Sequence, residues 1–389
     1  MSRKRPSVNT ETKSARACTI VTMRAPVITG ESAVTALGRT LAETRAALAA
    51  GRSAVGEVED DGAPPAADRS PAARIGAFTT EPELPKSKAR RLDRGSQYAV
   101  VAVRQVLADA GYSVAGREER TGILLGTGSA GVGPLTEFER QMAVESPDAA
   151  SPFLFPNTVA NAPASQAAIE VGIKGPNVTI TQKDPAALNA LFYARMLLAD
   201  GRADALLVGA ADEWNLVYHR AYERVHATRT QRRPGFVLGE GAAVVLVEDE
   251  TAARARGARI DARIAGLASR GTPLSPQKRR AEPAVLAAAM RDALDQAGLS
   301  PTGIGLVHLS RNGSPFTDAA ESAALADVFG ARLPRTVAVK DSLGENPAIG
   351  AIQVALAAAE LRADPSLGAI LIDAFGAGGN VLAAVLTAP

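Results

Sequence analysis

Short apolar runs alternate with longer amphipathic stretches along most of this 389-residue chain. Apolar runs bounded by glycine or polar residues predict buried strands, whereas longer segments with apolar positions three and four residues apart predict helices. The predicted strands are 25–30, 122–126, 177–181, 205–210, a pair that turns within 235–248, 260–267, 306–309, 336–339, 369–372 and 380–386. The predicted helices are 39–50, 92–110, 159–171, 185–199, 283–297, 318–329 and 348–362.

This order of strands and helices predicts a layered α/β protein. The pattern starts again near residue 259, which indicates an internal duplication with one half at 23–250 and the other at 251–389. We expect no independent domain boundary at 250, because each sheet needs helices of the other half to cover it. Residues 52–88, rich in Pro, Gly, Asp and Ala, predict a loop-dominated excursion.

Composition excludes several classes of function. With 43 basic and 41 acidic residues the net charge is +2, which gives no support for nucleic-acid binding. The single cysteine, Cys18, cannot form a disulfide within the chain, and no apolar run is long enough to cross a membrane, so we expect a cytoplasmic protein. Residues 1–22 are polar and basic, and predict either a disordered tail or translation that starts at Met23.

Several segments together resemble the β-ketoacyl synthase family of the thiolase superfamily. They are GESAVTALGRTLAETRAALAAGRSAV at 30–55, RLDRGSQYAVVAVRQVLADAG at 91–111, SPFLFPNTVANAPASQAAIEVGIKGPNVTIT at 151–181, GFVLGEGAAVVLVED at 235–249 and AFGAGGNVLAAVL at 374–386. The resemblance runs from about residue 25 to the end, in the family's order and spacing. It implies a thiolase-like fold, with duplicated α/β halves in a five-layer αβαβα arrangement.

At the position of the family's nucleophile, this chain has a different residue. Active members carry a cysteine at a tight turn before a buried helix, where the helix dipole favours the thiolate. Aligning the helix that begins at Ala187 places Asp184 at that position, and no cysteine occurs between residues 19 and 389. An aspartate cannot hold a transferable acyl thioester, so the chemistry excludes chain elongation by the family's route.

The resemblance places both catalytic histidines at positions that are also replaced. Ser310 stands where the family has the first histidine, and Glu345 follows a Lys-Asp-Ser-Leu-Gly segment where the second is expected. An ionised glutamate would repel the enolate that the histidines stabilise in active members. Of the catalytic set only Lys340 is retained, so no catalytic set is intact.

Each of these positions also has a purely structural interpretation. Asp184 followed by Pro185 is typical of a capped helix start. Lys183 could pair with Asp184 or Glu345 and fill the former acyl pocket, which would then be neutralised and collapsed. Asp318 and Glu321, like Lys340, match positions that brace the active-site loops.

Other segments contain residues that are common in binding sites, but their neighbours in the sequence favour a structural role. The glycine-rich stretches 235–241 and 376–379 lead into strands and therefore do not fit a phosphate-binding loop. In the second, Ala377 replaces the phenylalanine of the family's gate. His308 on an apolar strand indicates a core residue, and the basic run 229–233 indicates either a solvated loop or a contact with an acidic carrier protein.

The resemblance implies a chain-length-factor-like subunit without activity of its own. Such a subunit forms a heterodimer with an active ketosynthase through about 151–181 and shapes the tunnel for substrates tethered to an acyl carrier protein. Polyketide, aryl polyene or specialised fatty acid biosynthesis would each fit, and we expect no cofactor and no metal. One alternative is a hydrolase or cyclase that uses Asp184, Glu345 and Ser310, and another is a homodimeric binding protein. A plugged pocket would favour the partner subunit, whereas a raised pKa in an open pocket would favour the enzyme.

Overall fold

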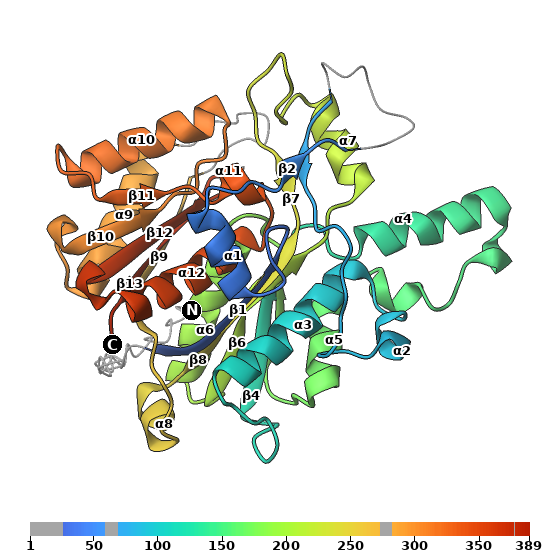
Figure 1. Cartoon of the computed structure of the whole chain (residues 1–389), viewed down its shortest axis with the longest axis horizontal. Coiled ribbons are helices and arrows are strands. Elements are labelled where there is room, and N and C mark those ends of the chain that lie inside the picture. Colours follow the sequence, from blue (N-terminus) through green and yellow to red (C-terminus); the bar gives the residue numbers. More distant parts are fainter. Residues whose placement is uncertain (1–25, 59–68, 273–281, 377) are drawn as a thin grey trace, which may run out of the picture.

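A computed structural model describes residues 26–58, 69–272, 282–376 and 378–389 (Figure 1). The predicted tail at 1–22, part of the 52–88 excursion and Ala377 lie outside these described residues. No helix of the described segments is long and apolar enough to cross a membrane.

Ten strands form one mixed sheet, in the order β11-β10-β12-β13-β9-β1-β8-β6-β4-β5. Their bounds are β1 (Val27–Thr35), β4 (Thr121–Gly126), β5 (Asn177–Ile180), β6 (Ala205–Asp212), β8 (Gly241–Glu248), β9 (Ala262–Gly271), β10 (Ile304–His308), β11 (Arg335–Val337), β12 (Ala369–Phe375) and β13 (Asn380–Thr387). A second, three-stranded sheet contains β2 (Val55–Gly56), β3 (Ala72–Ala73) and β7 (Leu238–Gly239).

The two halves of the large sheet repeat one topology. From the centre outward, each half runs through its first, fifth, fourth, second and third strand, as β1-β8-β6-β4-β5 and as β9-β13-β12-β10-β11. Corresponding pairs also share their direction, since β4 is parallel to β6 and β10 is parallel to β12. Within the sheet, the two halves join where Val27 and Ile28 of β1 pair with Arg263 and Ala262 of β9. This repeat agrees with the internal duplication expected from the sequence.

The helices complete a five-layer arrangement (Figure 1). Helices α6 (Ala186–Ala199) and α12 (Ile349–Ala363) share one central core with residues of both sheet halves. A second core lies under α3 (Arg94–Asp109) and α5 (Ala162–Val171), and a third lies under α9 (Pro283–Ala297) and α10 (Pro315–Phe329). Twelve of the fifteen residues of α12 are buried, which its sequence IGAIQVALAAAELRA predicts for a helix covered on all sides. The thiolase-like αβαβα layering is thus confirmed.

The remaining helices are α1 (Leu41–Ala49), α2 (Lys86–Ala89), α4 (Val132–Arg140), α7 (Leu216–Arg224), α8 (Glu250–Ala255) and α11 (Lys340–Leu343). The sequence analysis assigned no helix to α4 or α7. For α7 a local signal exists, because Asn215 accepts a hydrogen bond from the backbone N–H of Tyr218 and caps the helix. Helix α4 gives no such signal, because its N-cap residue is Gly131, which has no side chain to accept a hydrogen bond.

Strand β9 and helix α9 approach each other closely at Gly266, and a substitution there tests how tightly the outer helices pack on the sheet. A methyl group at Gly266 would overlap the carbonyl oxygen of Ala293, so we expect Gly266→Ala to lower the free energy of unfolding by about 1–3 kcal/mol. At Gly271 of the same strand the nearest atom to such a methyl is 3.9 Å away, and Gly271→Ala should have little effect. Urea unfolding of both variants measures the difference, and equal stability would contradict this packing.

Candidate functional site

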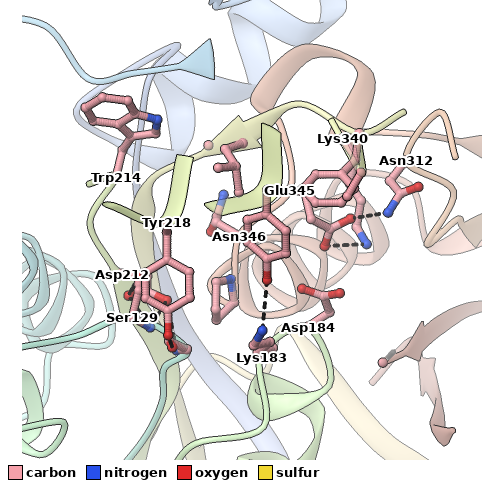
Figure 2. Close-up of a pocket in the computed structure, with 18 of the residues that line it drawn as sticks. Ser129, Lys183, Asp184, Asp212, Trp214, Tyr218, Asn312, Lys340, Glu345 and Asn346 are labelled. Carbon is pink, nitrogen blue, oxygen red and sulfur yellow. Dashed lines mark hydrogen bonds and ion pairs between the residues drawn. The ribbon is translucent and has the colours of Figure 1, made fainter. Parts of the chain in front are cut away.

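A cavity of about 460 Å³ opens where strands of both halves end at their carboxyl edge (Figure 2). Residues that follow β4, β6, β10 and β12 line it, together with the turns that precede α6 and α12. Open α/β sheets bind ligands at this edge. The residues that line the cavity include Lys183, Asp184, Trp214, Tyr218, Tyr222, Phe236, Leu238, Ser310, Asn312, Lys340, Glu345, Asn346 and Phe375.

The four site positions expected from the sequence all line this cavity: Asp184, Ser310, Lys340 and Glu345. The ammonium of Lys340 lies 3.0 Å from Glu345 Oε1 and donates to Ser310 Oγ at 3.2 Å. Asn312 Nδ2 donates to Glu345 Oε2 at 2.8 Å. Lys340 and Glu345 are only 4% and 6% exposed, so this polar cluster forms the deep end of the cavity.

Burial and charge set the protonation of this cluster. Burial raises the pKa of Asp184 well above its ordinary value, and the neighbouring Glu345 raises it further, while Lys340 opposes the shift. Burial alone would lower the pKa of Lys340, but the carboxyls of Glu345 and Asp184 reverse this and leave it raised. At the deep end, the ammonium of Lys340 therefore lies beside Glu345 and beside an Asp184 whose raised pKa favours the neutral form.

Three structural expectations for the turn before α6 are wrong. Asp184 does not cap α6, because Pro185 occupies the N-cap position and no side chain caps the helix. The helix begins one residue later than the capping pattern requires, and the carboxyl of Asp184 interacts with Glu345 instead.

Lys183 pairs with neither carboxyl. It adopts a left-handed backbone conformation with φ 53°, and its ammonium donates to Tyr222 Oη at 2.8 Å. That ammonium also lies 5.8 Å from the ring centre of Tyr218 and 5.3 Å from that of Tyr222 (Figure 2). Because the side chain is held against these rings, it does not fill the cavity, which remains open rather than collapsed.

Carboxylates brace the loops around the site, as expected for Asp318 and Glu321. Glu321 Oε1 accepts from the backbone N–H of Ser310 at 2.6 Å, and Asp318 Oδ1 accepts from that of Asn312 at 3.0 Å. Asp373, two residues before the end of β12, was not expected from the sequence and also accepts from Ser310 N–H at 3.1 Å.

The other half holds an equivalent carboxylate that was also missed. Asp212, at the end of β6, accepts from the backbone N–H of Gly128 at 2.8 Å. Burial raises the pKa of Asp212 to about 6, although Ser129 and Gly128 lower it by donating hydrogen bonds. An acidic residue at the end of an apolar strand was the available signal for Asp212 and Asp373.

Other candidate groups lie outside the cavity. His308 is fully buried and hydrogen-bonds Glu360 at 2.8 Å, which agrees with its assignment to the core. In the run 229–233, Arg229 and Arg232 are exposed.

Among the described residues, the one acidic group with metal-ligand spacing is Glu31, Asp109 and Asp261. Arg259 pairs with Asp109 and Asp261, and Arg362 pairs with Glu31. These carboxylates therefore already have cationic partners.

The Lys340–Glu345 pair should dominate the stability of the site. Lys340→Met leaves the Glu345 carboxylate buried without its counter-charge, and we expect the free energy of unfolding to fall by about 3–5 kcal/mol. Adding Glu345→Gln should recover much of this loss. As a control, Lys88→Met removes a surface pair with Glu170 and should cost less than about 1 kcal/mol. A urea titration in which Lys340→Met behaves like Lys88→Met would contradict this interpretation.

Comparison with solved structures supports the same fold. The chain aligns with "The ishigamide ketosynthase/chain length factor" at a TM-score of 0.84 and 25% identity, over 94% of this chain and 100% of the other. A β-ketoacyl synthase from Burkholderia phymatum STM815 gives a TM-score of 0.84 at 26% identity, with the same coverage. The ketosynthase of the AntDE:AntF complex is similar in fold, with a TM-score of 0.83 at 21% identity over 94% of this chain and 99% of the other.

Comparison with protein sequences leads to the same group of proteins. The 3-oxoacyl-[acyl-carrier-protein] synthase 2 of Staphylococcus aureus (strain COL) is 28% identical over 318 residues, which cover 76% of each chain. The enzyme of the same name from Vibrio cholerae is 29% identical over 315 residues, covering 77% of this chain and 75% of the relative. Family models for the N-terminal and C-terminal domains of β-ketoacyl synthase match residues 23–253 and 262–365. The chain therefore belongs to the β-ketoacyl synthase family.

Proposed function

We propose that this chain is a non-catalytic, chain-length-factor-like subunit that forms a heterodimer with an active ketosynthase. The observation that carries this proposal is the carboxyl of Asp184 in the turn before α6, at the position where the family resemblance leads us to expect a nucleophilic cysteine. A carboxyl at this position cannot form the acyl thioester that elongation requires. The complex would act on substrates tethered to an acyl carrier protein.

The rest of the cavity also lacks the groups that condensation needs. None of the chain's three histidines, His219, His226 and His308, lines the cavity. Ser310 accepts a hydrogen bond from the ammonium of Lys340, and this makes its hydroxyl oxygen a poorer nucleophile. Glu345 would oppose negative charge that develops on an enolate.

The surface around 151–181 supports a partner-binding role. Strand β5 is the last strand of the large sheet, so one of its edges is available for pairing. Large apolar side chains are exposed in this region, including Phe153 at 79%, Phe155 at 62% and Ile169 at 70%. Exposed apolar side chains that gather into one patch are typical of protein–protein interfaces, and we propose that these side chains form such a patch.

A second candidate function is a hydrolase or cyclase that uses Asp184 and Glu345 on carrier-bound substrates. The open cavity and the raised pKa of Asp184 favour it, since a carboxyl that stays protonated can act as a general acid. We rank it second because Glu345, the base it would need, is already paired with Lys340 and Asn312.

Co-expression with an active ketosynthase, followed by condensation with malonyl-loaded carrier protein, separates the two candidates. We expect this chain alone to be inactive, and the complex to keep its elongation rate within about twofold when Asp184→Ala is introduced, because Asp184 performs no chemical step. Loss of turnover by Asp184→Ala in an intact complex would instead support the carboxylate enzyme. A chain that stays homodimeric would contradict the partner role.

The exposed aromatic surface gives a separate test of the interface. Phe153→Asp places a charge on the proposed contact surface, and we expect it to weaken heterodimer formation by at least about thirtyfold, as for a central aromatic anchor. Phe316→Asp, at a 63% exposed position on α10, is the matched control and should leave affinity unchanged. Sedimentation or titration of the purified pair measures both, and equal affinities would rule out this surface.

A further inference from the structure

A group of buried acidic residues lies where the two halves of the large sheet join. Glu31 of β1 and Asp261, one residue before β9, are 4% and 0% exposed. The backbone N–H of Asp261 donates to Ile28 O at 2.8 Å, beside the pairing of β1 with β9. Asp109, the last residue of α3, accepts from the backbone N–H of Glu31 at 3.0 Å. The carboxyls of Glu31, Asp109 and Asp261 each place an oxygen within 4.8 Å of the other two.

Two guanidinium groups face these three carboxyls. Arg259 pairs with Asp261 at 2.7 Å and with Asp109 at 2.9 Å. Arg362, in the last turn of α12, pairs with Glu31 and lies 3.2 Å from Asp261. With all three carboxyls ionised, the group would carry one negative charge without a counter-charge. Burial makes such a charge costly.

Charged residues on the neighbouring elements leave this excess in place. Several of them form ion pairs of their own: Glu248–Arg256, Arg104–Glu170 and Glu83–Arg39. Arg45 of α1 lines a second cavity together with Glu31, but within the described residues no ion pair joins the two. The missing positive charge therefore does not come from the surrounding side chains.

The carboxyl of Glu31 is the group on which a proton removes the excess. Its Oε1 accepts from Arg362, whereas its Oε2 is buried without a hydrogen-bond partner, and a nitrogen of Arg259 lies 4.0 Å from it. A buried oxygen without a donor is satisfied when it carries a proton and donates it to a neighbouring acceptor. Burial and the neighbouring Asp261 raise the pKa of Glu31 to about 8, against the opposing effect of Arg362.

We propose that Glu31 is a neutral acid in the folded chain and that its O–H donates a hydrogen bond to the carboxylate of Asp261. This shared proton balances three carboxyls against two guanidiniums and holds the segment before β9 to β1. Its release sets two buried carboxylates against each other, so the junction between the halves is weaker in alkaline solution. The inference is independent of the proposed partner role, because it concerns the chain by itself.

The proton makes stability depend on pH in a defined direction. In the unfolded chain Glu31 loses its proton near its ordinary pKa of 4.5, whereas in the folded chain it keeps the proton up to a pKa of about 8. Between these values the folded chain binds one more proton than the unfolded chain. The part of the free energy of unfolding that depends on Glu31 therefore falls as the pH rises, and levels off above about pH 8.

Urea unfolding of the full-length chain across this pH range tests the proposal. Glu31→Gln keeps the oxygen that accepts from Arg362 and replaces the O–H with an amide N–H that can donate to Asp261. We expect the folding equilibrium constant of the parent, divided by that of Glu31→Gln, to fall at least about thirtyfold between about pH 5 and about pH 9. Glu248→Gln is the matched control, since Glu248 is also buried in a strand and paired with an arginine. Its ratio to the parent should stay nearly constant with pH.

Two further measurements do not depend on how stable Glu31→Gln is. The infrared difference between the parent and Glu31→Gln at neutral pH should contain the C=O stretch of a protonated carboxylic acid. Asp109→Asn, at an exposed position, removes a carboxylate that raises the pKa of Glu31. It should move the levelling-off of stability to lower pH, and this decides the matter if Glu31→Gln fails to fold.

The inference is overturned if the parent and Glu31→Gln have parallel pH profiles, if the carboxylic acid band is missing, or if Asp109→Asn leaves the profile unchanged. Stabilisation of the parent by Mg²⁺, lost in Glu31→Gln, would also overturn it, because a cation rather than a proton would then balance the group. Failure here is distinct from failure of the partner role, which is tested by complex formation and condensation.

Discussion

Helix α12 must be buried on nearly all sides, and much of the structure depends on that constraint. Its apolar sequence leaves only Glu360, Arg362 and Ala363 outside the core. A helix of this kind needs a sheet on either side. The duplicated halves supply them, and α6 lies beside α12 in the same central core. Since both helices begin at the carboxyl edge of the sheet, their first turns meet at the cavity.

The cavity is therefore a consequence of the layering rather than of any one catalytic residue. Loops after strands of both halves converge there, held by carboxylates at strand ends such as Asp212 and Asp373. This scaffold does not depend on which residue occupies the turn before α6, and the cavity is open with Asp184 there. The chemistry of its deep end comes from the Lys340–Glu345 ion pair and from Asp184, whose raised pKa favours the neutral form.

The proposed interface and the cavity are two different surfaces of the chain. The proposed interface consists of exposed apolar side chains near β5, whereas the cavity lies at the carboxyl edge of the sheet and has aromatic side chains in its wall. Helix α6 connects the two regions, because it begins at the cavity and packs against β5. A change in cavity occupancy therefore has a short structural route to the proposed interface.

The sequence by itself determined the order of the main elements, the duplication and the identity of the residues at the deep end. Apolar periodicity is a local property, and Asp184, Ser310, Lys340 and Glu345 could be placed from motif spacing alone. The sequence did not determine which way their side chains point. The Asp184-Pro185 pair is typical of a cap, yet the start of α6 at Ala186 turns the carboxyl toward Glu345. The pairing of Lys183 with Tyr222, the open cavity and the unpartnered amide of Asn346 were decided only by tertiary structure. Each depends on contacts between segments far apart in the chain, and such contacts leave no pattern in the local sequence.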